Sequence, residues 1–342
     1  MRAAVVTAFD RPLDVQERPV PEPGPGEVLV RIEACGLCRT DANSVRGDGP
    51  VRPAPPFVPG HEGVGVVRCA GPGVPDGMVG RRVGLAWLGS ACGRCRHCVT
   101  GRENLCDSRR DTGGTVDGTL AEYALADARF VVPVPDDIPS AEAAPLCCAG
   151  VSALAAVKAA RVCSGDRVAV FGIGSLGQLA VQYARLNGAL VFAVDVTWEK
   201  LDLALDLGAD RVVHAAEGDP VAALTRFGGV DVAIVMTPAP GAAEQALASL
   251  RSGGRLVLAA LPAWDRLDLS IADTVLRGIT VVGSIVGTRQ DLAEAFELHA
   301  AGRTRITVET HPLAAAADLL EKAFPGADER RLVIDVGMPD EE

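Results

Sequence analysis

Short apolar segments separated by glycine and proline turns make up the first part of the chain. Apolar and β-branched side chains recur in Val28 to Glu33, Gly63 to Cys69 and Arg81 to Leu85. Short runs of this kind, bounded by turn-forming residues, are typical of β-strands. The pattern therefore predicts an irregular, β-rich region.

From Ala141 onward the pattern changes. An alanine-rich helix is followed by apolar runs that alternate with amphipathic segments, and this alternation predicts βαβ units and a parallel sheet. The expected strands are Arg167 to Phe171, Leu190 to Val194, Arg211 to His214, Val230 to Met236 and Arg255 to Ala260.

Beyond Gly283 the periodicity predicts a helix from Arg289 to Ala301 and a final strand from Leu332 to Val336. With 342 residues, 48% of them hydrophobic, the chain can bury the cores of about two folding units.

The charge and the cysteine content narrow the possible surroundings of the protein. A formal net charge of -11 argues against nucleic acid and anionic membrane surfaces as partners. The first residues lack the features of a signal peptide, and we expect no segment long and apolar enough to span a membrane. Ten cysteines without an export signal favour the reducing cytoplasm, where clustered thiols serve metals or catalysis.

A glycine fingerprint follows the strand that ends at Phe171. Gly172, Gly174 and Gly177 form G-I-G-S-L-G at the start of a predicted helix. A glycine-rich turn without a ligand is the competing interpretation, but a strand precedes this one and Asp195 ends the next strand about 20 residues on. In that context the glycines predict a site for a dinucleotide pyrophosphate.

Asp195 indicates which dinucleotide the site prefers. A carboxylate at this position binds the adenosine ribose hydroxyls and repels a 2′-phosphate. No arginine stands among the next residues, Val196, Thr197 and Trp198, to neutralise such a phosphate. NAD is therefore favoured over NADP.

Four cysteines lie within fifteen positions of a turn-rich loop. Cys92, Cys95, Cys98 and Cys106 can supply four soft ligands to a tetrahedral structural Zn²⁺. Buried thiols or disulfides are the competing interpretation, which fits a polar loop poorly in a cytosolic chain. We expect His97 to be a solvated neighbour and not a ligand.

Three further segments each contain a cysteine or a histidine of a metal-ligating type. They are C-G-L-C-R-T-D with Cys38, P-G-H-E-G-V-G-V-V with His61, and A-A-P-L-C-C-A-G with Cys148. Together with the cysteine loop and the glycine fingerprint, they occur in the order found in zinc-containing medium-chain alcohol dehydrogenases. The chain resembles that family from end to end, and G-S-I-V-G-T-R-Q-D-L from Gly283 resembles its bacterial NAD-linked branch.

The resemblance implies a catalytic zinc held by Cys38, His61 and Cys148, with the fourth position open to water or alcohol. Two cysteines and a histidine with an open site also suit a catalytic zinc chemically. Thr40 resembles the hydroxyl that relays the alcohol proton. Asp41 resembles the acid that orients His61. Glu62 resembles the carboxylate that lies behind the metal, where it is expected to pair with Arg331.

The resemblance also implies cofactor and substrate contacts. It assigns Arg39 and Arg289 to the cofactor and Trp87, with Thr40, to a narrow pocket that favours small primary alcohols and their aldehydes. Arg39 and Asn43 replace histidines that many bacterial relatives carry. An amide at Asn43 does not accept a proton at neutral pH, so the end of the proton relay differs here.

The implied fold is mixed: a β-rich, GroES-like catalytic domain over residues 1–151 with its zinc loop at 92–106, an inserted α/β Rossmann domain over 152–283, and a return to the catalytic domain over 284–342. The resemblance implies two zinc ions and one NAD per chain, a homodimer or homotetramer, and reversible oxidation of an alcohol to an aldehyde or ketone.

Three other functions use the same scaffold or site: an aldehyde, ketone or enone reductase of specialised metabolism, a zinc-free quinone or enoyl reductase, and a zinc-held thiol sensor. The joint presence of Cys38, His61 and Cys148 counts against the zinc-free reductase. An intact nucleotide fingerprint counts against the sensor.

Overall fold

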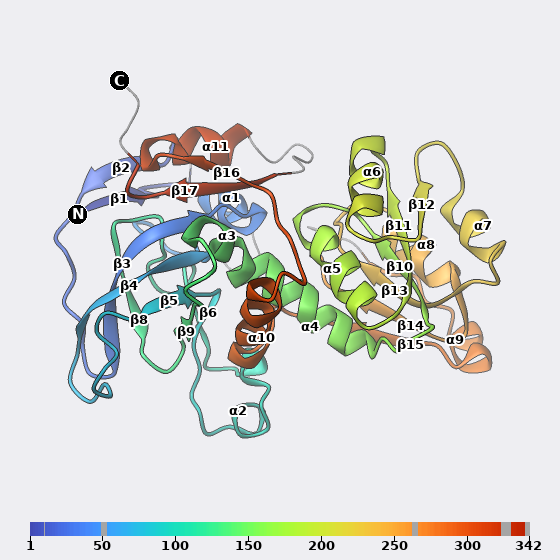
Figure 1. Ribbon diagram of the computed structural model, residues 1–342, viewed down its shortest axis with the longest axis horizontal. Coiled ribbons are helices and arrows are strands. Elements are labelled where there is room, and N and C mark those ends of the chain that lie inside the picture. Colours follow the sequence, from blue (N-terminus) through green and yellow to red (C-terminus); the bar gives the residue numbers. More distant parts are fainter. Residues whose placement is uncertain (10, 49–52, 262–265, 323–329, 339–342) are drawn as a thin grey trace. The chain divides into compact units, whose positions relative to one another are not determined.

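The computed structural model describes residues 1–9, 11–48, 53–261, 266–322 and 330–338, which form two compact units (Figure 1). The first unit comprises Met1–Val151, Thr288–Ala301 and Ile306–Glu342, and the second comprises Ser152–Gly287 and Gly302–Arg305. The second unit is thus inserted into the sequence of the first.

A seven-stranded, mainly antiparallel sheet forms the framework of the first unit. Its order is β16-β17-β3-β4-β5-β9, with β8 also paired to β3. The strands are β3 (Glu27–Gly36), β4 (Gly63–Ala70), β5 (Arg82–Leu85), β8 (Tyr123–Asp127), β9 (Val132–Pro133), β16 (Val308–His311) and β17 (Arg331–Asp335). Two small sheets pair β1 (Arg2–Val5) with β2 (Asp14–Glu17) and β6 (Leu88–Ser90) with β7 (Arg110–Asp111).

Short helices connect or cover these strands. They are α1 (Arg39–Arg46), α2 (Arg96–Val99), α3 (Ser140–Pro145), α10 (Arg289–Ala300) and α11 (Ala316–Lys322), with 3₁₀ turns at Glu103–Leu105 and Leu313–Ala315. The strand β3 is central because it pairs with β4, β8 and β17. Its apolar side chains, among them Val28, Val30 and Ile32, lie in the core of this unit.

Six parallel strands form the sheet of the second unit, in the order β12-β11-β10-β13-β14-β15. The strands are β10 (Arg167–Phe171), β11 (Leu190–Asp195), β12 (Arg211–His214), β13 (Val230–Val235), β14 (Leu250–Leu258) and β15 (Thr280–Gly283). The chain starts in the middle and winds outward in both directions, which is the doubly wound Rossmann order. The predicted fold class, a β-rich domain with a Rossmann domain, is confirmed.

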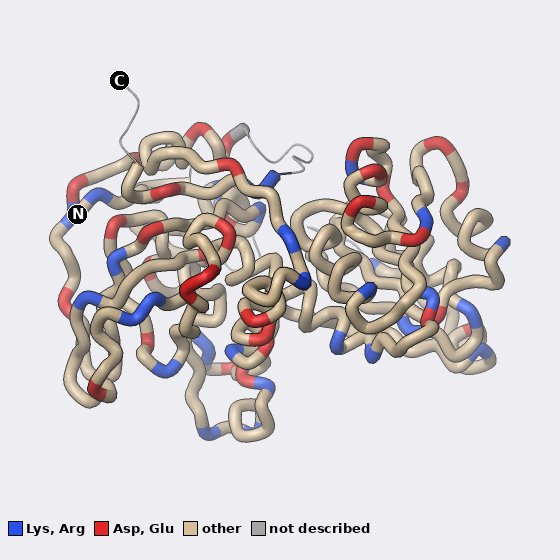
Figure 2. The backbone as a smooth tube through the Cα atoms, in the orientation of Figure 1, with Lys and Arg blue, Asp and Glu red and all other residues tan. Residues whose placement is uncertain are grey.

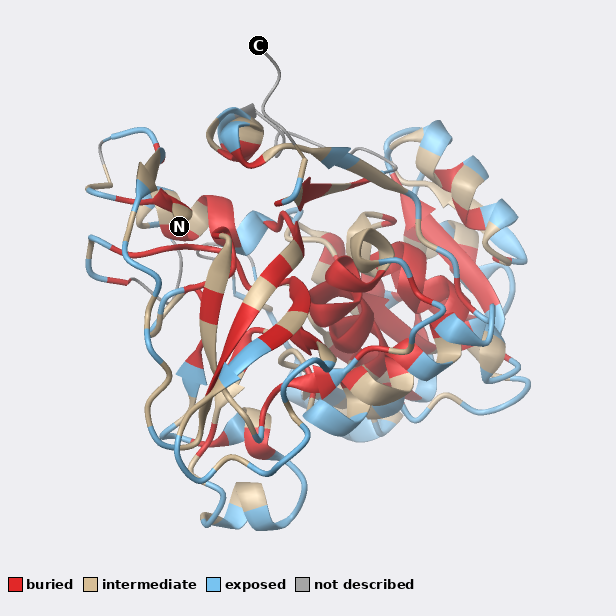
Figure 3. Cartoon of the chain, turned by 60° about the vertical axis from the view of Figure 1, so that its left-hand side comes forward, coloured by how far each residue is buried: buried red, intermediate tan, exposed pale blue. Residues whose placement is uncertain are grey.

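Helices on the faces of this sheet explain its nearly continuous apolar strands. They are α4 (Val151–Ala160), α5 (Ser175–Leu186), α6 (Trp198–Asp206), α7 (Pro220–Thr225), α8 (Ala242–Ala248) and α9 (Ile271–Arg277). A parallel sheet covered on both faces buries every side chain of its central strands. Val168 to Phe171 of β10 are accordingly buried, and Figure 3 shows the buried sheet and helices in red.

The strand predicted from Arg255 to Ala260 has different limits. The strand β14 begins five residues earlier, at Leu250, and ends at Leu258. Gly253 and Gly254 lie inside it, and a glycine pair in a sequence is the usual sign of a turn. The register with β13 shifts between Val230 and Val232, which is an irregularity that accommodates the glycines.

The prediction that no segment is long and apolar enough to span a membrane is wrong by length and composition. The helices α3 and α4, joined by a π-helical turn at Leu146–Gly150, form one continuous apolar helix, Ser140–Ala160, of 21 residues that is long enough to cross a bilayer. However, 83% of its most apolar window is buried inside the protein. This is the behaviour of a core helix, and the apolar side chains are used for packing.

The second unit allows a direct test of its packing at Phe192. This side chain of β11 is fully buried, and its ring lies 5.4 Å from that of Phe227. Phe192→Ala should destabilise the unit by about 3–5 kcal/mol and lower its Tm by about 10 °C, since it removes these contacts and leaves a cavity. Leu190→Ala, on the same strand but 40% exposed, is the control. Equal shifts in circular-dichroism melts of the two variants would contradict the buried packing.

Candidate active site

Three segments of the first unit bring Cys38, His61 and Cys148 together. Cys38 follows β3 and caps the N-terminus of α1, His61 lies just before β4, and Cys148 lies in the π-helical turn. All three side chains are buried. Their ligand atoms and one carboxylate oxygen of Glu62 all lie within 4.8 Å of one another.

The carboxylate of Asp41 connects two of these segments. Its Oδ2 accepts a hydrogen bond from the backbone N–H of Cys38 at 3.0 Å, and its Oδ1 accepts one from the N–H of Gly60 at 3.1 Å. The same Oδ1 lies 2.8 Å from Nδ1 of His61. Asp41 thereby forms the capping box of α1 and fixes the His61 ring, so that the two ligand loops share one anchor.

The donors fit a zinc ion. Among the described residues, Nε2 of His61 is buried without a hydrogen-bond partner, although the opposite ring nitrogen is held by Asp41. A hydrogen bond from Cys148 overcomes burial and lowers the pKa of Cys38 well below its usual value. A thiolate and an unpaired imidazole nitrogen, beside a second sulfur, are the ligand types that zinc prefers.

Glu62 occupies the remaining side of the cluster and is paired with Arg331. One guanidinium nitrogen of Arg331, from β17, lies 2.6 Å from each Glu62 oxygen. Burial raises the pKa of Glu62 to about 7, although Arg331 opposes this rise. Gly36 leaves room for the carboxylate, because a Cβ there would lie 2.0 Å from Oε2.

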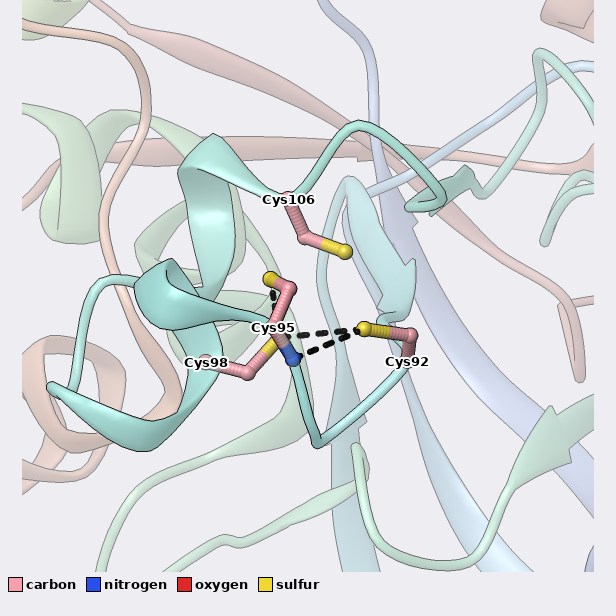
Figure 4. Close-up of side chains that lie close together, drawn as sticks. All are labelled: Cys92, Cys95, Cys98 and Cys106. Atoms are coloured by element: carbon pink, nitrogen blue, oxygen red, sulfur yellow. Dashed lines mark hydrogen bonds between the residues drawn. The ribbon is translucent and has the colours of Figure 1, made fainter.

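The cysteine loop forms a second cluster (Figure 4). Its four sulfur atoms, from Cys92, Cys95, Cys98 and Cys106, point toward a common centre and lie within 4.8 Å of one another. Backbone N–H groups, those of Arg94 and Cys95, lower the pKa of Cys92 to about 6, so this sulfur is ready to bind a cation. Four sulfur donors fit a structural zinc, and His97 is not part of the cluster.

The cysteine loop can hold little structure by itself. Most of its residues are exposed or half-buried, as the loop at the bottom of Figure 3 shows, and it contains only the four-residue helix α2 and the 3₁₀ turn Glu103–Leu105. A small apolar cluster of Leu88, Ala91, Cys106 and Phe130 anchors one end. A tetrahedral metal would supply the missing cross-links, as it does in small zinc modules.

In the second unit, the glycine fingerprint joins β10 to α5, and each of its glycines has different steric surroundings. Gly172 has φ +87, and a Cβ there would lie 2.5 Å from Cβ of Thr237. A Cβ at Gly177 would lie 1.9 Å from the carbonyl oxygen of Gly172. Gly174 caps α5, and a Cβ there would meet no atom within 4 Å. The open side at the helix N-terminus fits a pyrophosphate.

Asp195 ends β11 beside this turn, and its carboxylate is well supported. It accepts hydrogen bonds from the N–H groups of Ile173, at 2.6 Å, and Val196, at 2.7 Å. Nζ of Lys200, on α6, lies 3.8 Å from Oδ1. The sequence reasoning missed Lys200. The available signal was its place one turn into the helix after Asp195, in a chain whose basic residues are almost all arginine.

The other predicted residues lie in the first unit. Arg39, Thr40 and Asn43 lie on α1, immediately after Cys38, and the first two are exposed. Trp87 is buried, and the guanidinium of Arg109 lies over its ring at 5.2 Å. Arg289 starts α10, where it pairs with Glu103 at 3.1 Å.

Comparison with known families gives matches over both units. The model of the alcohol dehydrogenase GroES-like domain matches residues 24–136, and that of zinc-binding dehydrogenases matches residues 175–301. An alcohol dehydrogenase from Moraxella sp. (strain TAE123) is 46% identical over 99% of this chain and 100% of its own. One from Geobacillus stearothermophilus is 46% identical over 98% of this chain and 100% of its own.

Solved structures of similar fold include alcohol dehydrogenases. The alcohol dehydrogenase of the archaeon Aeropyrum pernix has a TM-score of 0.89 at 32% identity and covers 98% of this chain and 100% of its own. A zinc-binding dehydrogenase from Sinorhizobium meliloti 1021, bound to NADP, has a TM-score of 0.89 at 30% identity, with 98% of each chain covered. The chain therefore belongs to the zinc-containing medium-chain alcohol dehydrogenase family.

Proposed function

We propose that this protein is a zinc-dependent alcohol dehydrogenase that transfers a hydride reversibly between a small primary alcohol and NAD. The observation that carries the proposal is the cluster of Cys38, His61 and Cys148, in which Nε2 of His61 is buried and unpaired. A zinc ion held by these three side chains would act as a Lewis acid on the substrate oxygen.

The surrounding residues have supporting parts in this proposal. Asp41 keeps the proton on Nδ1 of His61 and leaves Nε2 to bind the metal. Thr40, on the exposed side of α1, would accept the alcohol proton at Oγ1 and pass it on. Arg39 would bind the cofactor pyrophosphate, and the bulk of Trp87 would restrict the pocket to small substrates.

NAD is the proposed hydride acceptor. The support comes from Asp195 and from the open N-terminus of α5 at Gly174. Relatives bind either dinucleotide: the Sinorhizobium meliloti structure holds NADP, and an acetophenone reductase from Geotrichum candidum, 30% identical, holds NAD. The choice therefore depends on residues around the adenosine ribose.

We also propose a homodimer or homotetramer in the cytoplasm. The helix α9 exposes Ile271, Val275 and Leu276 by 72–85%, and β15 is the outermost strand of its sheet. Exposed apolar side chains beside a strand edge are typical of a subunit interface. A monomeric mass in sedimentation equilibrium would overturn the assembly.

The ten free thiols support the proposed reducing compartment, the cytoplasm, which cell fractionation would test.

The first test of function is turnover. Zinc-loaded protein should oxidise small primary alcohols with NAD, as followed at the NADH absorbance band, and should contain two zinc ions per chain. Cys148→Ala should lose one zinc and turnover, because a catalytic ligand is missing. Cys106→Ala should lose the other zinc and mainly lower the Tm. Hydride transfer without zinc would favour the reductase, and zinc without hydride transfer the sensor.

A second test concerns Asp41. Asp41→Asn keeps the size of the side chain but presents an amide N–H where the carboxylate accepts hydrogen bonds from Cys38, Gly60 and His61. Zinc affinity at the catalytic site should fall about 10- to 100-fold, as measured by chelator competition. Asp76→Asn, in an exposed loop, is the control for charge. Equal zinc release by the two variants would contradict the anchoring part of Asp41.

A further inference from the structure

The cysteine loop, residues 92–106, contains one acidic residue, Glu103, and that residue is buried, with 6% of its surface exposed. Glu103 begins the 3₁₀ turn just before Cys106. The backbone N–H of Cys106 donates a hydrogen bond to the carbonyl oxygen of Glu103 at 3.0 Å. A buried carboxylate needs donors, so the group that pairs with Glu103 also influences the position of Cys106.

Arg289 supplies these donors. Its backbone N–H lies 3.3 Å and its Nε 3.1 Å from Oε1 of Glu103, and its Nη1 donates to the carbonyl oxygen of Arg129. Two of the three guanidinium nitrogens are thus used within the first unit. Arg289 is the first residue of α10, where the helix dipole disfavours a basic side chain unless an acid accompanies it. Glu103 is an acid in that place.

The guanidinium of Arg289 makes a second contact, with an aromatic ring. Its Cζ lies 4.3 Å from the centroid of the Phe130 ring, which is within the range of a cation–π contact. Phe130 belongs to the apolar cluster that anchors the loop, together with Leu88, Ala91 and Cys106, and against which the other three cysteines pack. Arg289 therefore contacts both the carboxylate that precedes Cys106 and the ring beside it.

The helix α10 can support the loop because it is itself held by the first unit. Its side chains Leu292, Ala295 and Phe296 are buried, and Thr288 and Asp291 form a capping box at its start. The ring of Phe296 packs so closely on β5 that a Cβ on Gly84 would lie 2.8 Å from its Cζ. A helix packed and capped in this way presents Arg289 from a fixed position.

The polarity of the Glu103–Arg289 pair is the reverse of the surrounding charge. Figure 2 shows acidic positions on α10 and basic positions on the loop; they are Asp291, Glu294 and Glu297 on the helix, and Arg94, Arg96 and Arg102 on the loop. A general attraction between helix and loop would need only these residues. The pair of opposite polarity, with its carboxylate buried, instead fixes one arrangement of the two segments.

We infer that Glu103 and Arg289 are positioning residues for the four-cysteine zinc site. They hold residues 103–106 against α10, so that Cys106 already lies near the other three sulfur atoms when the metal binds. This inference rests on the structural zinc of the proposed function. Binding of the cofactor by Arg289, which the family resemblance implies, is the alternative that the test separates.

The test measures the zinc affinity of the four-cysteine site by chelator competition in the full-length Cys148→Ala variant, which should keep that zinc alone. In this background Arg289→Met removes the guanidinium but keeps a long apolar side chain for Phe130. The zinc dissociation constant should rise about tenfold, since hydrogen bonds to a charged group are lost. Adding Glu103→Gln to Arg289→Met should weaken zinc binding no further, because both changes remove the same interaction.

Arg185→Met is the matched control. Arg185 is also half-exposed, pairs with an aspartate, Asp210, at 3.3 Å and donates to a backbone carbonyl, that of Ala189, but it lies in the second unit. Its zinc dissociation constant should equal that of the background. An unchanged constant in Arg289→Met would overturn the inference, and weaker NADH binding by that variant in calorimetry would then assign Arg289 to the cofactor.

A merely structural role of Arg289 is tested by the Tm. In the Cys106→Ala chain, which lacks the zinc site, Arg289→Met should have little further effect on the Tm, and an equal fall with and without Cys106 would overturn the inference. A wild type that binds zinc only at the Cys38 site would overturn the structural zinc and the inference with it. A wild type with both zinc ions that oxidises no alcohol would overturn only the proposed reaction.

Discussion

The hydrogen bonds to the buried carboxylate of Asp41 are the interaction on which the candidate catalytic metal site depends. Asp41 is 2% exposed and receives the backbone N–H groups of Cys38 and Gly60 as well as the ring of His61. A buried carboxylate is stable only when its oxygens are satisfied by donors. The interaction is reciprocal, because the same carboxylate links the segment that carries Cys38 to the segment that carries His61.

The same constraint, that a buried charged group needs a partner, applies to the ion pair of Glu62 and Arg331. Neither charge is favourable in a core, and each is tolerated because the other lies 2.6 Å away. The pair joins the loop before β4 to β17, which lie far apart in the sequence and are linked through β3. The strand β17 thus helps to hold a carboxylate that lies among the candidate metal ligands.

In the second unit, backbone geometry shapes the candidate ligand site, whereas side chains form the candidate metal site of the first unit. In a doubly wound sheet, ligands bind at the carboxyl ends of the strands next to the point where the strand order reverses. Gly172 to Gly177 follow β10, and Asp195 ends β11, so the phosphate and ribose groups of one ligand would meet neighbouring strands. The loop after β12 continues this edge, and Oε1 of Glu217 there accepts a hydrogen bond from Nε1 of Trp198.

The sequence by itself determined the strand and helix alternation, the glycine fingerprint and the four-cysteine loop, because strand periodicity and motif spacing are local patterns. The candidate ligands Cys38, His61 and Cys148 are scattered, and only their resemblance to a known family predicted them. The sequence misplaced β14, where a glycine pair lies inside a strand instead of a turn. It did not indicate the π-helical turn around Cys148, the lysine beside Asp195 or the hydrogen bond between Trp198 and Glu217. These features were decided by the tertiary structure, since burial, register and the pairing of charges depend on residues that folding alone brings together.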